Sequence, residues 1–200
     1  MRNSLYILVF FASGVMLGYQ QWIPAWLNDS DPSTYALYAL MLLVGISIGA
    51  DKGALLLIRS QGIRLLLVPL ATIAGTFGGV LLVTSLTGNL SLREGLAVGA
   101  GFGYYSLSSI IITQLHSEAL GVVALLSNVI REILTLLLAP VMVVMFGRIA
   151  PIASAGATSM DTTLPIITAA SGKEYTIIAL FHGIILTILV PMLVSLILTF

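Results

Sequence analysis

The sequence has no cysteine and few charged residues, and both deficits exclude classes of protein. Without cysteine, neither a disulfide framework nor a thiolate metal site is possible. Two histidines are too few for a histidine-rich metal site, so we expect no metal and no organic cofactor. Charged residues make up 8% of the 200 residues, against about a quarter in ordinary chains. Eight basic side chains balance eight acidic ones, which argues against a nucleic-acid partner.

Hydrophobic residues, by contrast, make up 58% of the chain, which predicts an all-α, polytopic membrane protein with one transmembrane domain over residues 1–200. A helix that crosses the lipid bilayer needs about 20 mostly apolar residues. Three G-x-x-x-G pairs, at 14/18, 45/49 and 75/79, permit close packing of such helices. We predict five transmembrane helices, at 5–22, 34–50, 65–86, 121–146 and 175–200.

Two further hydrophobic segments, about 96–114 and 152–171, are rich in glycine, serine and threonine, and the second contains Pro165. Glycine and proline interrupt the helical hydrogen-bond ladder. Such backbone is tolerated at membrane depth only inside protein or beside a water-filled cavity. Both segments are therefore predicted to be interrupted helices, which either cross the membrane or re-enter from one side.

The distribution of basic residues favours the re-entrant arrangement by a single residue. The basic stretch 51–64 predicts a cytoplasmic loop. If both interrupted segments re-enter, Arg148 and Lys173 also lie inside and Arg93 alone lies outside; if both span, Arg148 lies outside. Either arrangement predicts a cytoplasmic N-terminus and an external C-terminus.

The two interrupted segments also resemble each other. Residues 101–113 and 156–168 both begin with glycine and end in Ile-Ile-Thr. This similarity has two explanations. It indicates an inverted repeat, the arrangement in which transporters place paired broken helices, or it is a coincidence between two segments built from few residue types.

Glu132 lies halfway along 121–146, where a charge costs about 2.5–3.5 kcal/mol. It must therefore face the bundle interior or stay protonated. Asn128 and Thr135 share its helical face, whereas Arg131 points about 100° away. Glu132 and Arg131 either serve transport or pair with other helices to fix the packing. Asn128 either binds substrate or hydrogen-bonds a neighbouring helix.

Asp161 is the second intramembrane acid. Hydroxyl residues around it and Pro165 after it predict a half-helix that begins near Thr162. The N–H groups of that helix start would attract a carboxylate, and the Asp161 side chain would attract an ammonium group or a proton. The alternative is that Asp161 only caps the half-helix.

Other polar residues have two possible roles as well. His182 either relays protons or stays neutral and hydrogen-bonds a nearby helix. The hydroxyl groups of the interrupted segments either bind substrate or protons, or satisfy freed backbone groups. These hydroxyl residues are Tyr104, Tyr105, Ser106, Ser108, Ser109, Thr158, Ser159, Thr162 and Thr163.

Three ordered motifs resemble the lysine exporter (LysO-type) family over nearly the whole chain. They are Gly101-Phe-Gly-Tyr-Tyr-Ser-Leu-Ser108, Asn128-x-x-Arg131-Glu132 and Gly156-Ala-Thr-Ser-Met-Asp161-x-Thr-Leu-Pro165. The resemblance implies export of L-lysine and of analogues such as thialysine across a bacterial inner membrane. It also implies that Glu132 and Asp161 matter. Longer members have additional N-terminal helices, so we expect a homodimer or a small membrane partner.

Moving a cation outward against the membrane potential costs about 2.3 kcal/mol per 100 mV, which exchange for an incoming proton or sodium ion would offset. We therefore expect a secondary transporter rather than an enzyme. An aspartyl intramembrane protease needs two embedded aspartates, and only Asp161 qualifies. The alternatives are a sodium/proton antiporter, a channel, or a partner subunit that is inactive alone.

Overall fold

The computed structural model describes residues 63–200, together with single positions at 13, 16, 17, 19, 20, 35, 39, 42 and 46. The chain separates into two compact units, Met1–Leu40 and Met41–Phe200, and all the elements described below belong to the second. Over residues 63–200 every regular element is helical, as expected for an all-α protein. The predicted spans at 5–22 and 34–50 fall outside the described stretch.

Three long helices in this stretch are apolar enough to cross a membrane, and they confirm three of the predicted helices. They are α5 (Leu67–Thr87), which follows the short η1 (Ile63–Leu66), α8 (Glu118–Phe146), and α11 (Thr176–Thr199), which follows η3 (Lys173–Tyr175). At 1.5 Å per residue they are about 32 to 44 Å long, enough for a hydrocarbon core of about 30 Å. Gly88, in a left-handed conformation, ends α5, and the Ser117 hydroxyl accepts the Leu120 N–H at the start of α8.

Each predicted interrupted segment consists of two short helices separated by a break. The first contains α6 (Leu92–Gly99) and α7 (Tyr105–Leu115). The second contains α9 (Ala150–Ala155), the 3-10 turn η2 (Gly156–Met160) and α10 (Leu164–Ser171). The breaks coincide with the glycine-rich and hydroxyl-rich stretches of the sequence. We refer to α6–α7 as the first hairpin and to α9–α10 as the second.

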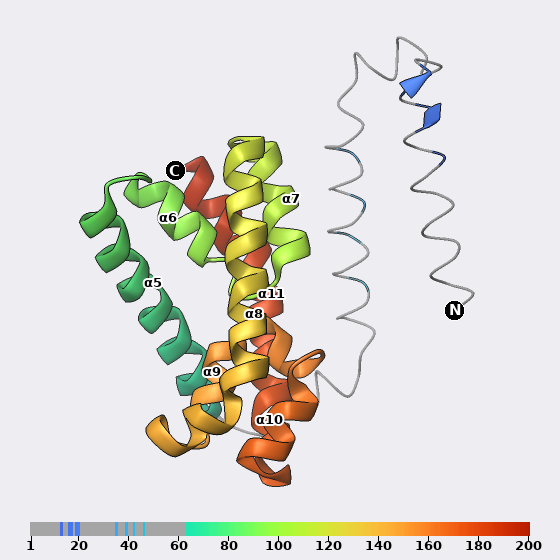
Figure 1. The fold of residues 1–200 in the computed structure, drawn as a ribbon. Helices are drawn as coiled ribbons and strands as arrows, with labels where there is room; N and C mark the ends of the chain where they lie inside the picture. Colours follow the sequence, from blue (N-terminus) through green and yellow to red (C-terminus); the bar gives the residue numbers. More distant parts are fainter. Residues whose placement is uncertain are drawn as a thin grey trace. The chain divides into compact units, whose positions relative to one another are not determined.

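Both hairpins return to the end of the helical bundle from which they start (Figure 1). In the first, His116 Nε2 after α7 lies 3.5 Å from Glu94 Oε1 at the start of α6. In the second, Arg148 before α9 forms a 2.7 Å ion pair with Glu174 after α10. The full length of α8 runs between the two, so the hairpins enter the bundle from opposite ends.

The end of α11 lies beside the mouth of the first hairpin, because the Arg93 side chain donates to the carbonyl oxygens of Ile197 and Leu198. Along the bundle, α8 packs on α7 and α9, and α11 packs on η2, α7 and α6. Gly183 lets η2 approach α11, since a Cβ there would lie 2.6 Å from the Cβ of Met160. The two breaks are thus held between α8 and α11.

Candidate functional site

The two breaks meet backbone to backbone. The Ala157 N–H donates to the Phe102 carbonyl at 2.7 Å. A Cβ on Gly103 would lie 2.7 Å from the Ala155 carbonyl oxygen, and one on Gly156 would lie closer than 3.0 Å to the Phe102 carbonyl oxygen. Gly103 and Gly156 both have positive φ angles, +91° and +67°. Glycine is therefore required at both positions for close approach and for backbone conformation.

Asn128, near the middle of α8, holds the first break. Its side-chain oxygen accepts the Gly103 N–H at 2.7 Å, and its amide nitrogen donates to the carbonyl oxygens of Ala124 at 2.8 Å and Val98 at 3.5 Å. The residue is 3% exposed. Of the two roles predicted for Asn128, these contacts favour the structural one.

Arg131, one turn further along α8, holds the second hairpin. It donates to the carbonyl oxygens of Ser154 at 2.7 Å and Ala153 at 2.9 Å, at the C-terminal end of α9. A cation is favourable there, because the last carbonyls of a helix carry partial negative charge. Thr135 joins the same contact through a 2.7 Å hydrogen bond with the Ser154 hydroxyl. One face of α8, defined by Asn128, Arg131 and Thr135, thus contacts both hairpins.

Glu132 does not share these contacts. It is half-buried, and its side chain has no hydrogen bond and no ion pair with any residue in 63–200. Helix geometry predicted that the Arg131 and Glu132 side chains point in different directions, and the structure agrees, since the two form no ion pair with each other. Glu132 also lines neither of the two cavities described below, so the structure does not bring it together with Asp161.

Asp161 is exposed and lines a cavity of about 140 Å³ at the crossing of the two breaks. Among the described residues no cation lies within ion-pair distance of its carboxylate. The cavity brings together five predicted site residues: Tyr104, Tyr105, Ser106, Thr158 and Thr162. Its other lining residues are Gly103, Ala157, Met160 and Thr187.

Thr187 is a functional candidate that the sequence reasoning missed. Thr187, on α11, lines the Asp161 cavity, and its hydroxyl is buried with no hydrogen-bond partner in the described part of the chain. Buried hydroxyls are normally hydrogen-bonded, so this one has capacity for a bound ligand or water. The signal in the sequence was a single polar residue in the middle of a long apolar helix.

The start of α10 differs from the prediction. The helix begins at Leu164 rather than near Thr162, with Pro165 in its first turn as expected. The N–H groups before it are already used: Thr162 donates to the Asp161 carboxylate at 2.6 Å, Thr163 to the Thr158 carbonyl and Leu164 to the Asp161 carbonyl. Pro165 has no N–H, so in the first turn of α10 only Ile166 keeps an N–H without a described acceptor, and this helix start offers little of the predicted carboxylate trap.

Several predicted hydroxyl residues satisfy local backbone groups. Ser108 donates to the Tyr104 carbonyl at 2.8 Å and Ser109 to that of Ser106 at 3.3 Å. In the second hairpin, Thr158 donates to the Ala155 carbonyl and Thr163 to the Thr158 carbonyl, both at 2.9 Å. Such bonds replace the helical ladder where the chain breaks.

His182 is fully buried and connects three elements. Its Nε2 lies 2.9 Å from the Thr72 hydroxyl on α5, and its Nδ1 lies 3.1 Å from the Ser159 hydroxyl on η2. The Ser159 hydroxyl also donates to the Ala179 carbonyl on α11, and the Thr72 hydroxyl donates to the Val68 carbonyl on α5. Of the two predicted roles, this arrangement favours a structural hydrogen bond over a proton relay.

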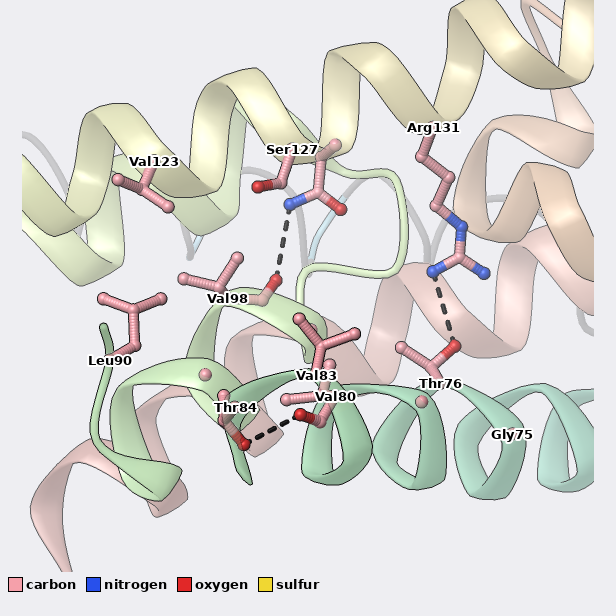
Figure 2. A pocket seen from close by; sticks show the side chains of 14 residues that line it. Gly75, Thr76, Val80, Val83, Thr84, Leu90, Val98, Val123, Ser127 and Arg131 are labelled. Atoms are coloured by element: carbon pink, nitrogen blue, oxygen red, sulfur yellow. Dashed lines mark hydrogen bonds between the residues drawn. The ribbon is translucent and has the colours of Figure 1, made fainter. Parts of the chain in front are cut away.

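A second and larger cavity, of about 430 Å³, lies between α5, α6 and α8 (Figure 2). Figure 2 shows Arg131 reaching from α8 towards Thr76 on α5, with Ser127 on the same side. Gly75 and Gly79, predicted to permit close helix packing, line this cavity, and a Cβ at either would have no described atom within 4 Å. The other two G-x-x-x-G pairs lie outside the described residues.

Comparison with known proteins gives a consistent family. The family model described as "Lysine exporter LysO" matches residues 8–198. A Haemophilus influenzae protein named "Putative lysine exporter" is 35% identical over 184 residues, which cover 90% of each chain. The Escherichia coli protein named "Lysine exporter LysO" is 31% identical over 168 residues, 84% of this chain but 55% of that protein. No solved structure matches the chain.

Proposed function

Because the chain belongs to the lysine exporter family, we propose that it exports L-lysine, and cationic analogues such as thialysine, across a bacterial cytoplasmic membrane. The three long apolar helices support the membrane location. The names of the two relatives support lysine as the substrate.

In this proposal α5, α8 and α11 span the membrane together with the predicted helices at 5–22 and 34–50, and both hairpins are re-entrant. The contacts that close the hairpins at opposite ends, His116 with Glu94 and Arg148 with Glu174, support this topology. Arg148 and Lys173 mark the cytoplasmic end by the positive-inside rule. The C-terminus, beside Arg93, is then external.

The Asp161 cavity binds the side-chain ammonium group of lysine. One observation carries this assignment: Asp161, whose exposed carboxylate has no described cationic partner, lines the same cavity as Thr187, whose buried hydroxyl also has no described partner. The cavity of about 140 Å³ is small beside ligand pockets of roughly 300–1,000 Å³, so it suits one end of the amino acid rather than the whole.

Asp161 also couples efflux to an incoming proton or sodium ion. A carboxylate that must release its proton or sodium ion before it accepts an ammonium group exchanges one cation for another. This exchange offsets the cost of moving lysine outward against an inside-negative potential. Glu132, half-buried and unpaired among the described residues, is the second acid proposed to take part.

The alignment with 55% of the E. coli relative supports a homodimer, or a small membrane partner, as the complete transporter. A relative of similar length, the H. influenzae protein, is matched over 90% of its length. Expression of the chain with and without its neighbouring small membrane gene distinguishes a self-sufficient exporter from a partner subunit.

The test is thialysine resistance and radiolabelled lysine efflux in exporter-deficient bacteria. We expect Asp161→Asn to reduce efflux to the level of cells without the protein, while the variant still inserts in the membrane. Glu118→Gln is the matched control, because it removes one exposed carboxylate at the start of α8, away from the cavity. Wild-type efflux by Asp161→Asn would overturn the role of Asp161. Ion-driven transport without any response to lysine would instead identify an antiporter.

A further inference from the structure

The larger cavity contains a cation whose charge is not balanced by any described carboxylate. Arg131 lines the space between α5, α6 and α8, and within residues 63–200 it has no ion pair. Its guanidinium carries five N–H donors. Three of them reach acceptors: the carbonyls of Ser154 and Ala153, and the Thr76 hydroxyl at a long 3.4 Å. Two donors have no acceptor in the described part of the chain.

The surroundings of Arg131 suit one small anionic group. Figure 2 shows the guanidinium pointing towards Thr76. The other polar side chains in the wall of the cavity are those of Thr84, Ser127 and Asn128, and the rest of the wall is apolar or glycine. The volume of about 430 Å³ falls in the range of ordinary ligand pockets. An unpaired charge inside a membrane protein is costly, so an anion that pairs with Arg131 is favoured there.

The Asp161 cavity leaves the other end of the amino acid without a partner. At the start of α10 the N–H groups of Thr162, Thr163 and Leu164 are used internally and Pro165 has none, so this helix start offers few donors to a carboxylate. The two cavities adjoin the same contact: Asn128 lines the larger one and accepts the N–H of Gly103, which lines the smaller one.

We propose that the cavity between α5, α6 and α8 is a carboxylate-binding site, in which Arg131 holds the α-carboxylate of the transported amino acid. This inference rests on the proposed function for its substrate. It adds a second binding region, distinct from the Asp161 cavity, and gives Arg131 a role beyond fixing α9.

Two neighbouring glycines provide a matched pair of variants. Gly79 lines the cavity and Gly78 does not, although both are exposed on α5 and a Cβ at either has nothing within 4 Å among the described residues. Gly79→Leu therefore fills the cavity without disturbing described packing, and Gly78→Leu places the same side chain outside it. Both variants leave the Arg131 contacts with α9 intact.

The experiment measures binding to the full chain, purified in lipid nanodiscs, with three probes. L-lysine carries both end groups, L-norleucine has the carboxylate without the side-chain ammonium, and 1,5-diaminopentane has two ammonium groups without a carboxylate. We expect Gly79→Leu to weaken L-lysine and L-norleucine binding by about 10- to 100-fold, the range for lost charge-assisted hydrogen bonds. Diaminopentane binding should change less than twofold, as should all binding to Gly78→Leu. Arg131→Gln should reproduce the Gly79→Leu pattern.

The outcomes separate this inference from the proposed function. If the wild type exports lysine but Gly79→Leu leaves the binding of L-lysine and L-norleucine unaffected, the carboxylate-site proposal alone is wrong. If Gly79→Leu loses L-norleucine binding but the wild type does not transport lysine, the export proposal alone is wrong. Equal loss of diaminopentane binding in Gly79→Leu also overturns the carboxylate assignment. The carboxylate assignment is also wrong if inorganic phosphate competes with L-lysine for binding and L-norleucine does not. That result would identify a site for a lipid phosphate.

Discussion

Replacing Gly156 by alanine tests the crossing of the two breaks. Gly156 has φ +67° and ψ −131°, a conformation that side chains disfavour by about 1–3 kcal/mol. The added Cβ would also lie within 3.0 Å of the Phe102 carbonyl oxygen, a backbone atom. Relief of this clash separates Phe102 from the Ala157 N–H and leaves a buried polar group unpaired, at about 1–3 kcal/mol. We expect Gly156→Ala to destabilise the protein by about 2–6 kcal/mol in total.

Two other glycines separate these contributions. Gly147 has φ +90°, but a Cβ added there would have nothing within 4 Å, so Gly147→Ala reports the conformational cost alone, about 1–3 kcal/mol. Gly78 lies within α5 with open space around it, and Gly78→Ala should stabilise the helix by about 0.5–1 kcal/mol. The measurement is the free energy of unfolding by denaturing detergent in mixed micelles. If Gly156→Ala is no less stable than Gly147→Ala, the backbone contact between the breaks is wrong.

Two further predictions concern Asn128 and Glu94. Asn128→Ala should cost about 1–3 kcal/mol in the same unfolding assay because it leaves the buried Gly103 N–H unpaired, whereas Ser127→Ala, next to it on α8, should be nearly neutral. Hydrogen bonds from the Ser91 side chain and backbone hold the pKa of Glu94 below 4.5, so its stabilising contribution is present above about pH 4.5 and is lost as the pH falls through the lowered value. The wild type should therefore lose more free energy of unfolding than Glu94→Gln when the pH is lowered from 5 to below the pKa of Glu94. Equal losses in the two proteins would contradict the capping box at the start of α6, in which Ser91 and Glu94 each accept a hydrogen bond from the other's backbone N–H.

The long helices were predictable because each is an apolar run bounded by polar residues. Predicted segments 65–86, 121–146 and 175–200 correspond to α5, α8 and α11, with ends displaced by at most three residues. The largest displacement is at the start of α8, where Glu118 belongs to the helix although it is charged. An acid in a first turn is stabilised by the free N–H groups, so it does not end an apolar helix.

The partners of the polar residues were not predictable from helix periodicity. On the surface of α8, Asn128 and Thr135 lie between Arg131 on one side and Glu132 on the other, and the sequence favoured Glu132 as the residue shared with Asn128 and Thr135. The structure instead gives Arg131 this place, because the carbonyl oxygens that end α9 lie within its reach. Those carbonyls come from a hairpin more than 20 residues away in sequence, and no local pattern specifies their position.

The site around Asp161 was predicted in part. The hydroxyl-rich stretch correctly indicated an interruption, and five of the other candidate site residues line one cavity with Asp161. The start of α10 was placed two residues too early, because the Thr163 hydroxyl and N–H both donate to the Thr158 carbonyl and prolong the turn before the helix. Thr187 comes from α11, and only the packing of η2 against that helix brings its hydroxyl to the cavity.

A single turn of α8 carries the attachment points of both hairpins, Asn128 for one and Arg131 for the other. Neither hairpin can therefore shift along α8 by itself: it must either break its hydrogen bonds to the helix or move the helix, and with it the opposite hairpin.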